Sequence, residues 1–438
     1  MENDDDDYVS DSNTSSILSG VSDDDHDMHS DNNDDDDESS NDNFDDTVPD
    51  LKASPPKWTE DIQGFDLPHF RLQSGPSLPD DFSDNSHPAD YFKLFFTEDL
   101  VQSFVDYTNK YAAIQINKKR ITIPNYIDKE WSLDGSNNVT KQEMWAYLGS
   151  CIILSINPFR QLRHVFSADP YMNNAGIREI FTLRRFTKIS NYLCVSDKEN
   201  EPERDSSQYD KLFKIRPVVQ KLNELFPKYY KHSAHQVIDE TSIKMASRDS
   251  VRQFCPQKPG ARFAWKVWSR CDSESPQKPY LLQFIPYLGK KHTKVSKHGL
   301  YFDVVNALTK SLRGTNVRLY TDNAYSSLKL FKFLRKYSVF CTGTARGNSV
   351  GLHPYVKNPP KKAPRGFHKI FQDENDRNVT CAVWFDTKAV RFISTETDPT
   401  IVCSALRRIL FGLPTLFSGN PSLQFWVPEG LPRIFLRA

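Results

Sequence analysis

The hydrophobic pattern of this chain changes its period at His235, and this change most limits the folds that the chain can adopt. Upstream, apolar residues recur at helical spacing, whereas downstream short β-branched and aromatic runs are typical of strands. We expect strands over 235–243, 262–272 and 279–289, then a helix over 298–314, a strand over 316–322, a helix over 326–337 and a strand over 338–346. That order predicts an α/β fold in which helices pack on a mixed sheet.

Helical spacing upstream of this unit predicts four helices, over 89–113, 141–156, 177–195 and 211–230. The last should become regular near Arg216, because the proline that follows is tolerated in a first helical turn. Within the α/β unit, Gly314 can end the helix before it. Further on, 380–395 is expected to form a β-hairpin with Asp386 at or near its turn.

The charge of the chain is divided unevenly along it, although the net charge is only −1. Residues 1–50 hold twenty Asp or Glu and no Lys or Arg, so the remaining 388 residues hold 57 − 20 = 37 acids against 56 bases, a net of +19. A basic body favours a polyanionic partner such as nucleic acid, but a basic protein with a solubilising acidic tail fits the charge equally well. The acidic arm lacks core-forming residues, and we expect it to be disordered.

Cysteine usage and the start of the chain bear on its compartment. Seven scattered cysteines without a CxxC pair indicate reduced thiols and no zinc site. Met1 is followed by acids, so no signal peptide is expected. No apolar run approaches roughly eighteen residues, so no membrane span is expected either. These features predict a cytosolic or nuclear protein, and none suggests a small-molecule cofactor.

Two aspartates lie in the predicted sheet where a carboxylate needs a partner. Asp239 lies within the first strand of the α/β unit, and Asp322 ends the fourth. If these strands are neighbours, the carboxylates are separated by one strand spacing of about 5 Å plus the reach of the side chains. Mg²⁺ suits such a pair, because it binds one or two carboxylates together with waters and phosphates. Spacing alone leaves open a structural role, in which both aspartates cap strands or accept hydrogen bonds from loop amides.

A basic segment, GKKHTKVSKHG (289–299), separates the third strand from the helix that follows. Its lysines could contact DNA phosphates without reading bases, or they could simply be solvated. These lysines are Lys290, Lys291, Lys294 and Lys297. A second basic run, KNPPKKAPR (357–365), could touch DNA or act as a nuclear import signal.

Several stretches, in the right order, resemble piggyBac-type transposases and their domesticated relatives over most of residues 58–410. They are RDSSQYDKLFKIRPVVQKLNELFPKYY, VIDETSIKMASR, QFCPQKPGARFAWKVWSRCDS, YLLQFIPYLGK, YTDNAYSSLKLFKFLRKYSVFCTGTARGNSVGL and WFDTKAVRFIST. The resemblance implies an RNase H-like catalytic core, preceded by an all-helical region and carrying a β-rich insertion.

The same resemblance implies a chemistry and a site. Asp239 in VIDE corresponds to the first catalytic aspartate of the family, and Asp322 in YTDN to the second. In active relatives these residues bind a divalent metal, Mg²⁺ or Mn²⁺, for in-line attack at phosphodiesters, and excised ends join to TTAA targets. The resemblance therefore implies DNA as the partner, a possible homodimer and a nuclear protein.

The chain departs from the family after ALRRI (405–409). The third catalytic aspartate of the family, in a Gly-Val-Asp-type motif, is not found, and neither is the cysteine-rich zinc-binding tail. The later acids Asp386 and Asp398 match nothing catalytic. We therefore expect a transposase-derived DNA-binding protein that is defective in transposition; the alternative is a domesticated, non-catalytic DNA- or chromatin-binding protein.

These patterns divide the chain into six predicted parts. They are a disordered acidic arm (1–54), an extended linker (55–88) whose aromatic anchors lie on the folded body, a helical DNA-binding or dimerisation region (89–232), an incomplete RNase H-like core (233–372), a partial β-rich insertion (373–409) and a tail unlike the family (410–438).

Overall fold

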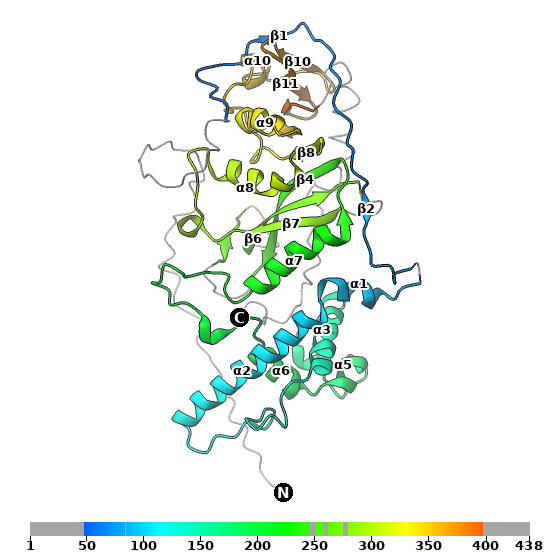
Figure 1. Cartoon of the computed structure of the whole chain (residues 1–438), viewed down its shortest axis with the longest axis vertical. Helices are drawn as coiled ribbons and strands as arrows, with labels where there is room; N and C mark the ends of the chain where they lie inside the picture. The colour runs from blue at the N-terminus through cyan, green and yellow to red at the C-terminus, as the bar shows by residue number, and fades with distance from the viewer. Residues whose placement is uncertain (1–47, 84, 246–250, 257–261, 275–278, 397–438) are drawn as a thin grey trace. The chain divides into compact units, whose positions relative to one another are not determined.

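A large mixed sheet dominates the computed structural model, which describes residues 48–83, 85–245, 251–256, 262–274 and 279–396. Ten of the described strands form it, in the order β1-β10-β11-β12-β9-β8-β4-β6-β5, with β7 paired to β6 (Figure 1). The central strands are β4 (His235–Lys244), β6 (Phe263–Asp272), β8 (Val317–Thr321) and β9 (Val339–Thr344). The others are β1 (Trp58–Thr59), β5 (Gln253–Phe254), β7 (Tyr280–Pro286), β10 (His368–Asp373), β11 (Asp376–Phe385) and β12 (Ala389–Ser394).

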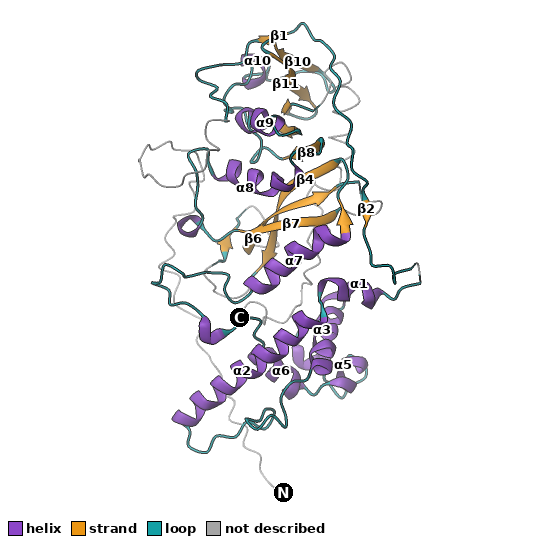
Figure 2. Cartoon of the chain, in the orientation of Figure 1, coloured by secondary structure: helices purple, strands orange, loops and turns teal. Residues whose placement is uncertain are grey.

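The centre of the sheet has the strand order that places the site. β4 pairs antiparallel with β6 and parallel with β8, and β8 pairs parallel with β9. Parallel neighbours need crossover connections, which here are the helices α8 (Leu300–Thr309) and α9 (Leu328–Arg335) (Figure 2). The predicted mixed α/β order, with the first strand of the unit beside the fourth, is thereby confirmed.

One face of this sheet is apolar and is covered by α8 and α9. Along β8, Val317, Leu319 and Thr321 are buried, whereas Arg318 and Tyr320 are only half-buried. This alternation is what a strand with one apolar face produces. The main core joins Val317 and Leu319 to side chains of both helices and of neighbouring strands, among them Ile238, Trp268, Val305, Leu308, Phe331, Phe333 and Cys341.

Seven α-helices precede β4 in the described part of the chain, and five of them begin at a residue whose side chain caps the first turn. The seven are α1 (Pro88–Phe95), α2 (Glu98–Thr122), α3 (Lys141–Ile156), α4 (Leu162–Val165), α5 (Ala175–Ile180), α6 (Leu183–Tyr192) and α7 (Arg216–Tyr229). A second core joins residues of α2, α3, α5 and α6. The predictions for α3 and for the start of α7 at Arg216 are confirmed.

Two of the predicted helices are wrong as single elements. The segment 89–113 is split between α1 and α2 at Thr97, whose hydroxyl accepts a hydrogen bond from the Leu100 N–H at 3.3 Å. The segment 177–195 is split in the same way at Thr182. In both cases the apolar spacing continues past the break, because a threonine in extended backbone caps the next helix without disturbing the apolar pattern.

The C-terminal described strands extend the central sheet. β11 and β12 form the predicted hairpin, with Asp386 in its turn, and β12 then pairs antiparallel with β9. Gly314, at a φ of +78°, follows the short helical turn that ends α8, as predicted. The predicted division between core and insertion stays a prediction.

Residues 48–76 form a strap along the folded body, as the first aromatic anchors predicted. β1 pairs with β10, and the Trp58 indole N–H donates to the Gly351 carbonyl at 2.9 Å. The strap continues to β2 (Gly75–Pro76), which pairs with β3 (Tyr230–Lys231) in a separate two-stranded sheet (Figure 1).

Several predictions concern residues outside the described ranges. These are the acidic arm up to residue 47, Asp398 and the tail 410–438. Within the described ranges, no helix combines the length and the apolar character that a membrane crossing needs.

Candidate functional site

The register of β4 and β8 brings Asp239 and Asp322 together. The last paired residues of these parallel strands are Ile238 and Thr321, so the two aspartates are the next residue of each chain at the carboxyl edge of the sheet. Ile238 lies in the apolar core beneath α8 and α9, and side chains alternate between faces. Both aspartates therefore lie on the opposite face, side by side.

Asp322 is held by the turn that follows β8 and by the adjacent strand. The Thr344 hydroxyl, at the end of β9, donates to Asp322 Oδ1 at 2.9 Å. The Ser326 hydroxyl donates to the Asp322 carbonyl at 2.9 Å and lies 2.7 Å from Thr321 Oγ1. Gly343 makes this packing possible, since a Cβ there would overlap the Ser326 and Thr321 hydroxyls.

Asp239 is half-buried on β4. Its Oδ1 accepts a hydrogen bond from the Glu240 N–H at 2.7 Å. Glu240 itself lies on the other face of the strand, where its Oε2 is 3.9 Å from Lys266 Nζ. Directly across from Asp239 on β6 is Ser269, which is buried.

The residues around Asp239 fit a hard divalent cation that keeps part of its water shell. Two carboxylates supply oxygen ligands, the donor type that Mg²⁺ and Mn²⁺ prefer. Two buried hydroxyls, that of Ser269 opposite Asp239 on β6 and that of Tyr325 in the turn after Asp322, have no hydrogen-bond partner within the described chain. The described residues contain no group of three or more His, Cys, Asp or Glu able to hold a metal, so this pair would provide only part of a coordination shell.

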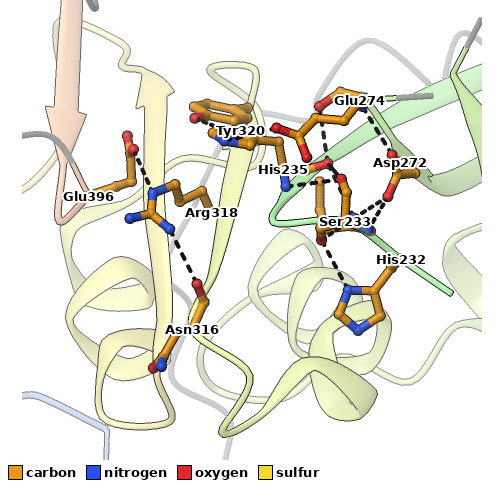
Figure 3. Close-up of polar contacts among 11 residues, drawn as sticks. His232, Ser233, His235, Asp272, Glu274, Asn316, Arg318, Tyr320 and Glu396 are labelled. Atoms are coloured by element: carbon orange, nitrogen blue, oxygen red, sulfur yellow. Dashed lines mark hydrogen bonds and ion pairs between the residues drawn. The ribbon is translucent and has the colours of Figure 1, made fainter. Parts of the chain in front are cut away.

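Figure 3 shows polar side chains near the beginnings of β4 and β8, among them His235, Arg318 and Tyr320. His235 Nδ1 lies 2.8 Å from the Tyr320 hydroxyl, and the two rings are stacked. Arg318 Nε lies 3.3 Å from Glu396 Oε1. On β8 these polar side chains lie opposite the main apolar core, whereas on β4 and β6 the same face also carries Val237 and Val267, which are buried.

The predicted basic loop lies between β7 and α8. Lys290 begins a short 3₁₀ turn (Lys290–His292), and Lys290, Lys294 and Lys297 are all exposed, while the side chain of Lys291 lies outside the described part. At the end of the loop, His298 Nδ1 lies 2.8 Å from Lys329 Nζ. Because Lys329 is in the first turn of α9, the end of the basic loop contacts the helix that follows the Asp322 turn.

The later acid Asp386 is occupied elsewhere. It lies in the β11–β12 turn, where its carboxylate pairs with Arg365 Nε at 2.5 Å. The tryptophans Trp265 and Trp268 are buried in the sheet.

Sequence reasoning did not single out Thr344, Ser269 or Tyr325. Ser269 is linked to Asp239 only by the antiparallel register of β4 and β6, and Thr344 to Asp322 only through the parallel neighbour β9. Tyr325 lies within the stretch YTDNAYSS, but no pattern in the sequence predicts that its side chain is buried.

Comparison with known proteins gives consistent matches. The family described as Transposase IS4 matches residues 87–409. The human PiggyBac transposable element-derived protein 2 is 26% identical over 329 residues, covering 73% of this chain and 50% of the relative. The human PiggyBac transposable element-derived protein 5 is 24% identical over 360 residues, covering 78% of this chain and 63% of the relative. The chain thus spans about half to two-thirds of the length of these relatives.

A solved structure shares the fold. The structure described as a piggyBac transposase synaptic complex with hairpin DNA superposes with a TM-score of 0.62 at 23% identity, covering 74% of this chain and 63% of that one. Since the family match extends over most of the chain, the protein belongs to the Transposase IS4 family, as a transposase-derived protein of the piggyBac type.

Proposed function

We propose that this chain is a DNA-binding protein with an RNase H-like core, in which Asp239 and Asp322 hold a divalent metal at the carboxyl edge of the sheet. The observation that carries the proposal is the parallel register of β4 and β8, which puts both carboxylates on one face at adjacent positions. Their match to the first two catalytic aspartates of the family supports the same assignment.

The residues of the chain have distinct tasks in this proposal. Asp239 and Asp322 would bind the cation, while Thr344 fixes the Asp322 carboxylate through its 2.9 Å hydrogen bond. When bound, Mg²⁺ or Mn²⁺ supplies Lewis-acid stabilisation of charge at a phosphodiester. With two of the three carboxylates of the family in these 438 residues, we expect metal binding without complete strand transfer at TTAA sites.

DNA binding would draw on the basic body of the chain. Lys290, Lys294 and Lys297 are exposed on one loop, and we propose that they, together with Lys291, contact phosphates. The DNA complex of the structural neighbour supports DNA as the partner, and the family supports a nuclear protein that could act as a homodimer.

A nicking assay tests this function. The full chain and Asp239→Asn are incubated with a hairpin or terminal-repeat DNA and with Mg²⁺ or Mn²⁺, and a chelator-treated sample gives the background. Metal-dependent cleavage that Asp239→Asn abolishes would support the metal site. Cleavage of equal extent in Asp239→Asn would refute the assignment of Asp239.

A second candidate is a domesticated protein that binds DNA or chromatin without catalysis. It is favoured by the exposed lysines of the basic loop, which can contact phosphates without any catalytic step. Salt-sensitive DNA binding, with no cleavage by the wild-type chain under any metal condition, would establish this alternative over the first.

A further inference from the structure

Two buried hydroxyls beside the candidate metal site have no hydrogen-bond partner among the described residues. Within the described chain three buried hydroxyls are in this state, namely those of Ser196, Ser269 and Tyr325. Ser196 follows α6 in the helical region, whereas Ser269 lies opposite Asp239 on β6 and Tyr325 lies in the turn that follows Asp322. Since buried hydroxyls in folded proteins are normally paired, the unpaired Tyr325 hydroxyl in the turn that follows Asp322 indicates an acceptor that the protein is built to receive.

Tyr325 is fixed beneath the turn that carries Asp322. Its N–H donates to the Asp322 carbonyl at 3.0 Å, and its ring packs edge-on against Tyr301 with centroids 5.1 Å apart. The side chain is 3% exposed and belongs to the main core. The position of the ring is therefore set by packing, and its hydroxyl is not held by any hydrogen bond within the described chain.

The surroundings of this hydroxyl are acidic. Burial, followed by the negative charges of Glu240, Asp239 and Asp322, raises the pKa of Tyr325 well above its ordinary value. A tyrosine hydroxyl, with an ordinary pKa of about 10, is protonated at neutral pH and can donate a hydrogen bond to an anionic oxygen or to a water.

We propose that Tyr325 is a positioning residue of the divalent-cation site, whose hydroxyl donates to an oxygen of the shell held by Asp239 and Asp322. That oxygen belongs to a carboxylate or to a cation-bound water, and both offer the acceptor that the phenol needs. The inference rests on the proposed metal site, and it adds the prediction that the site includes a donor from the core side of the sheet. Loss of an outer-shell partner typically weakens metal binding about 10- to 100-fold.

Mn²⁺ binding to the full chain tests the proposal, with the loss of the free Mn²⁺ electron paramagnetic resonance signal as the readout. Four proteins are compared: wild type, Tyr325→Phe, Asp239→Asn and Tyr147→Phe. The acidic residues 1–50 will bind Mn²⁺ weakly in every protein, so Asp239→Asn supplies the background to subtract. Tyr147 is the matched control, because it is a fully buried tyrosine whose hydroxyl already bonds to Ser190 Oγ at 3.1 Å.

The expected result is a site that Asp239→Asn removes, that Tyr325→Phe weakens by about 10-fold or more, and that Tyr147→Phe leaves unchanged. In chelator, Tyr325→Phe should unfold at the same or a higher temperature than wild type, because it deletes an unpaired buried hydroxyl. Unchanged Mn²⁺ affinity in Tyr325→Phe, with the site lost in Asp239→Asn, would overturn the role of Tyr325 alone. Absence of any site above the Asp239→Asn background would overturn the metal site and this inference together.

Discussion

Asp373, the last residue of β10, offers a demanding test of how the strap is attached. Its side chain is fully buried, and it accepts hydrogen bonds from Lys332 Nζ at 2.7 Å, the Lys57 N–H at 3.0 Å and the Asn375 N–H at 3.2 Å. One carboxylate thus joins α9, the strap and the β10–β11 turn. We predict that Asp373→Ala destabilises the protein and loosens the strap.

The size of the effect follows from what the substitution leaves behind. Removing one partner of a buried ion pair costs about 3–5 kcal/mol, because the other charge stays buried without compensation. The Lys332 side chain is 15% exposed, so some water reaches it and the lower part of that range applies. Lys57 is an exposed residue, so we expect water to replace the lost hydrogen bond of its N–H. We therefore expect a loss of about 3 kcal/mol in the free energy of unfolding.

Urea unfolding at neutral pH, followed by tryptophan fluorescence, measures this loss. Lys332→Met in the Asp373→Ala background is the control: it removes the stranded charge and should recover a large part of the stability. Limited proteolysis should cut Asp373→Ala between β1 and β2 sooner than wild type. A destabilisation below about 1 kcal/mol, or no recovery in the double variant, would refute the assignment of Asp373 as a buried anchor.

Three further predictions concern packing, pH and DNA. Gly343→Ala should lower the free energy of unfolding by about 1–3 kcal/mol, because the added Cβ would overlap Thr321 and Ser326. Gly149→Ala in α3 is the control: its added Cβ meets no atom within 4 Å, so it should be neutral or stabilising. The urea midpoints of the two variants measure the difference. Burial opposes ionisation of Asp128, but hydrogen bonds from Lys188 and Tyr192 outweigh it and lower the pKa of the carboxyl. Its contribution to stability is thus complete above its unfolded pKa of about 3.9 and is lost as the pH falls below that value, so Asp128→Asn should destabilise at pH 7 and less at low pH. Replacing Lys290, Lys294 and Lys297 with alanine should weaken the binding of DNA of every sequence. It should also reduce the slope of log affinity against log salt concentration by about 1 for each phosphate that a lysine no longer neutralises. An unchanged slope would show that these lysines do not contact phosphates.

The sequence alone predicted the order of elements in the α/β unit and the placement of Asp239 and Asp322 on neighbouring strands. The apolar alternation of β8 and the helical spacing of α3 and α8 are local patterns that can be read from neighbouring residues. They predict the structure correctly because each element buries its own apolar face. The breaks at Thr97 and Thr182 were missed, because a capping hydroxyl ends one helix and starts the next within an unbroken apolar pattern.

Only the tertiary structure decided what surrounds the aspartates. Ser269 lies opposite Asp239 on β6, and Thr344 bonds to Asp322 from β9; both placements depend on long-range strand pairing rather than on any local pattern. The same holds for Tyr325, which is buried in the main core because residues of α8, α9 and β4 pack together around it. Sequence patterns record which residues prefer burial, whereas the pairing of distant strands determines which polar groups are buried next to one another.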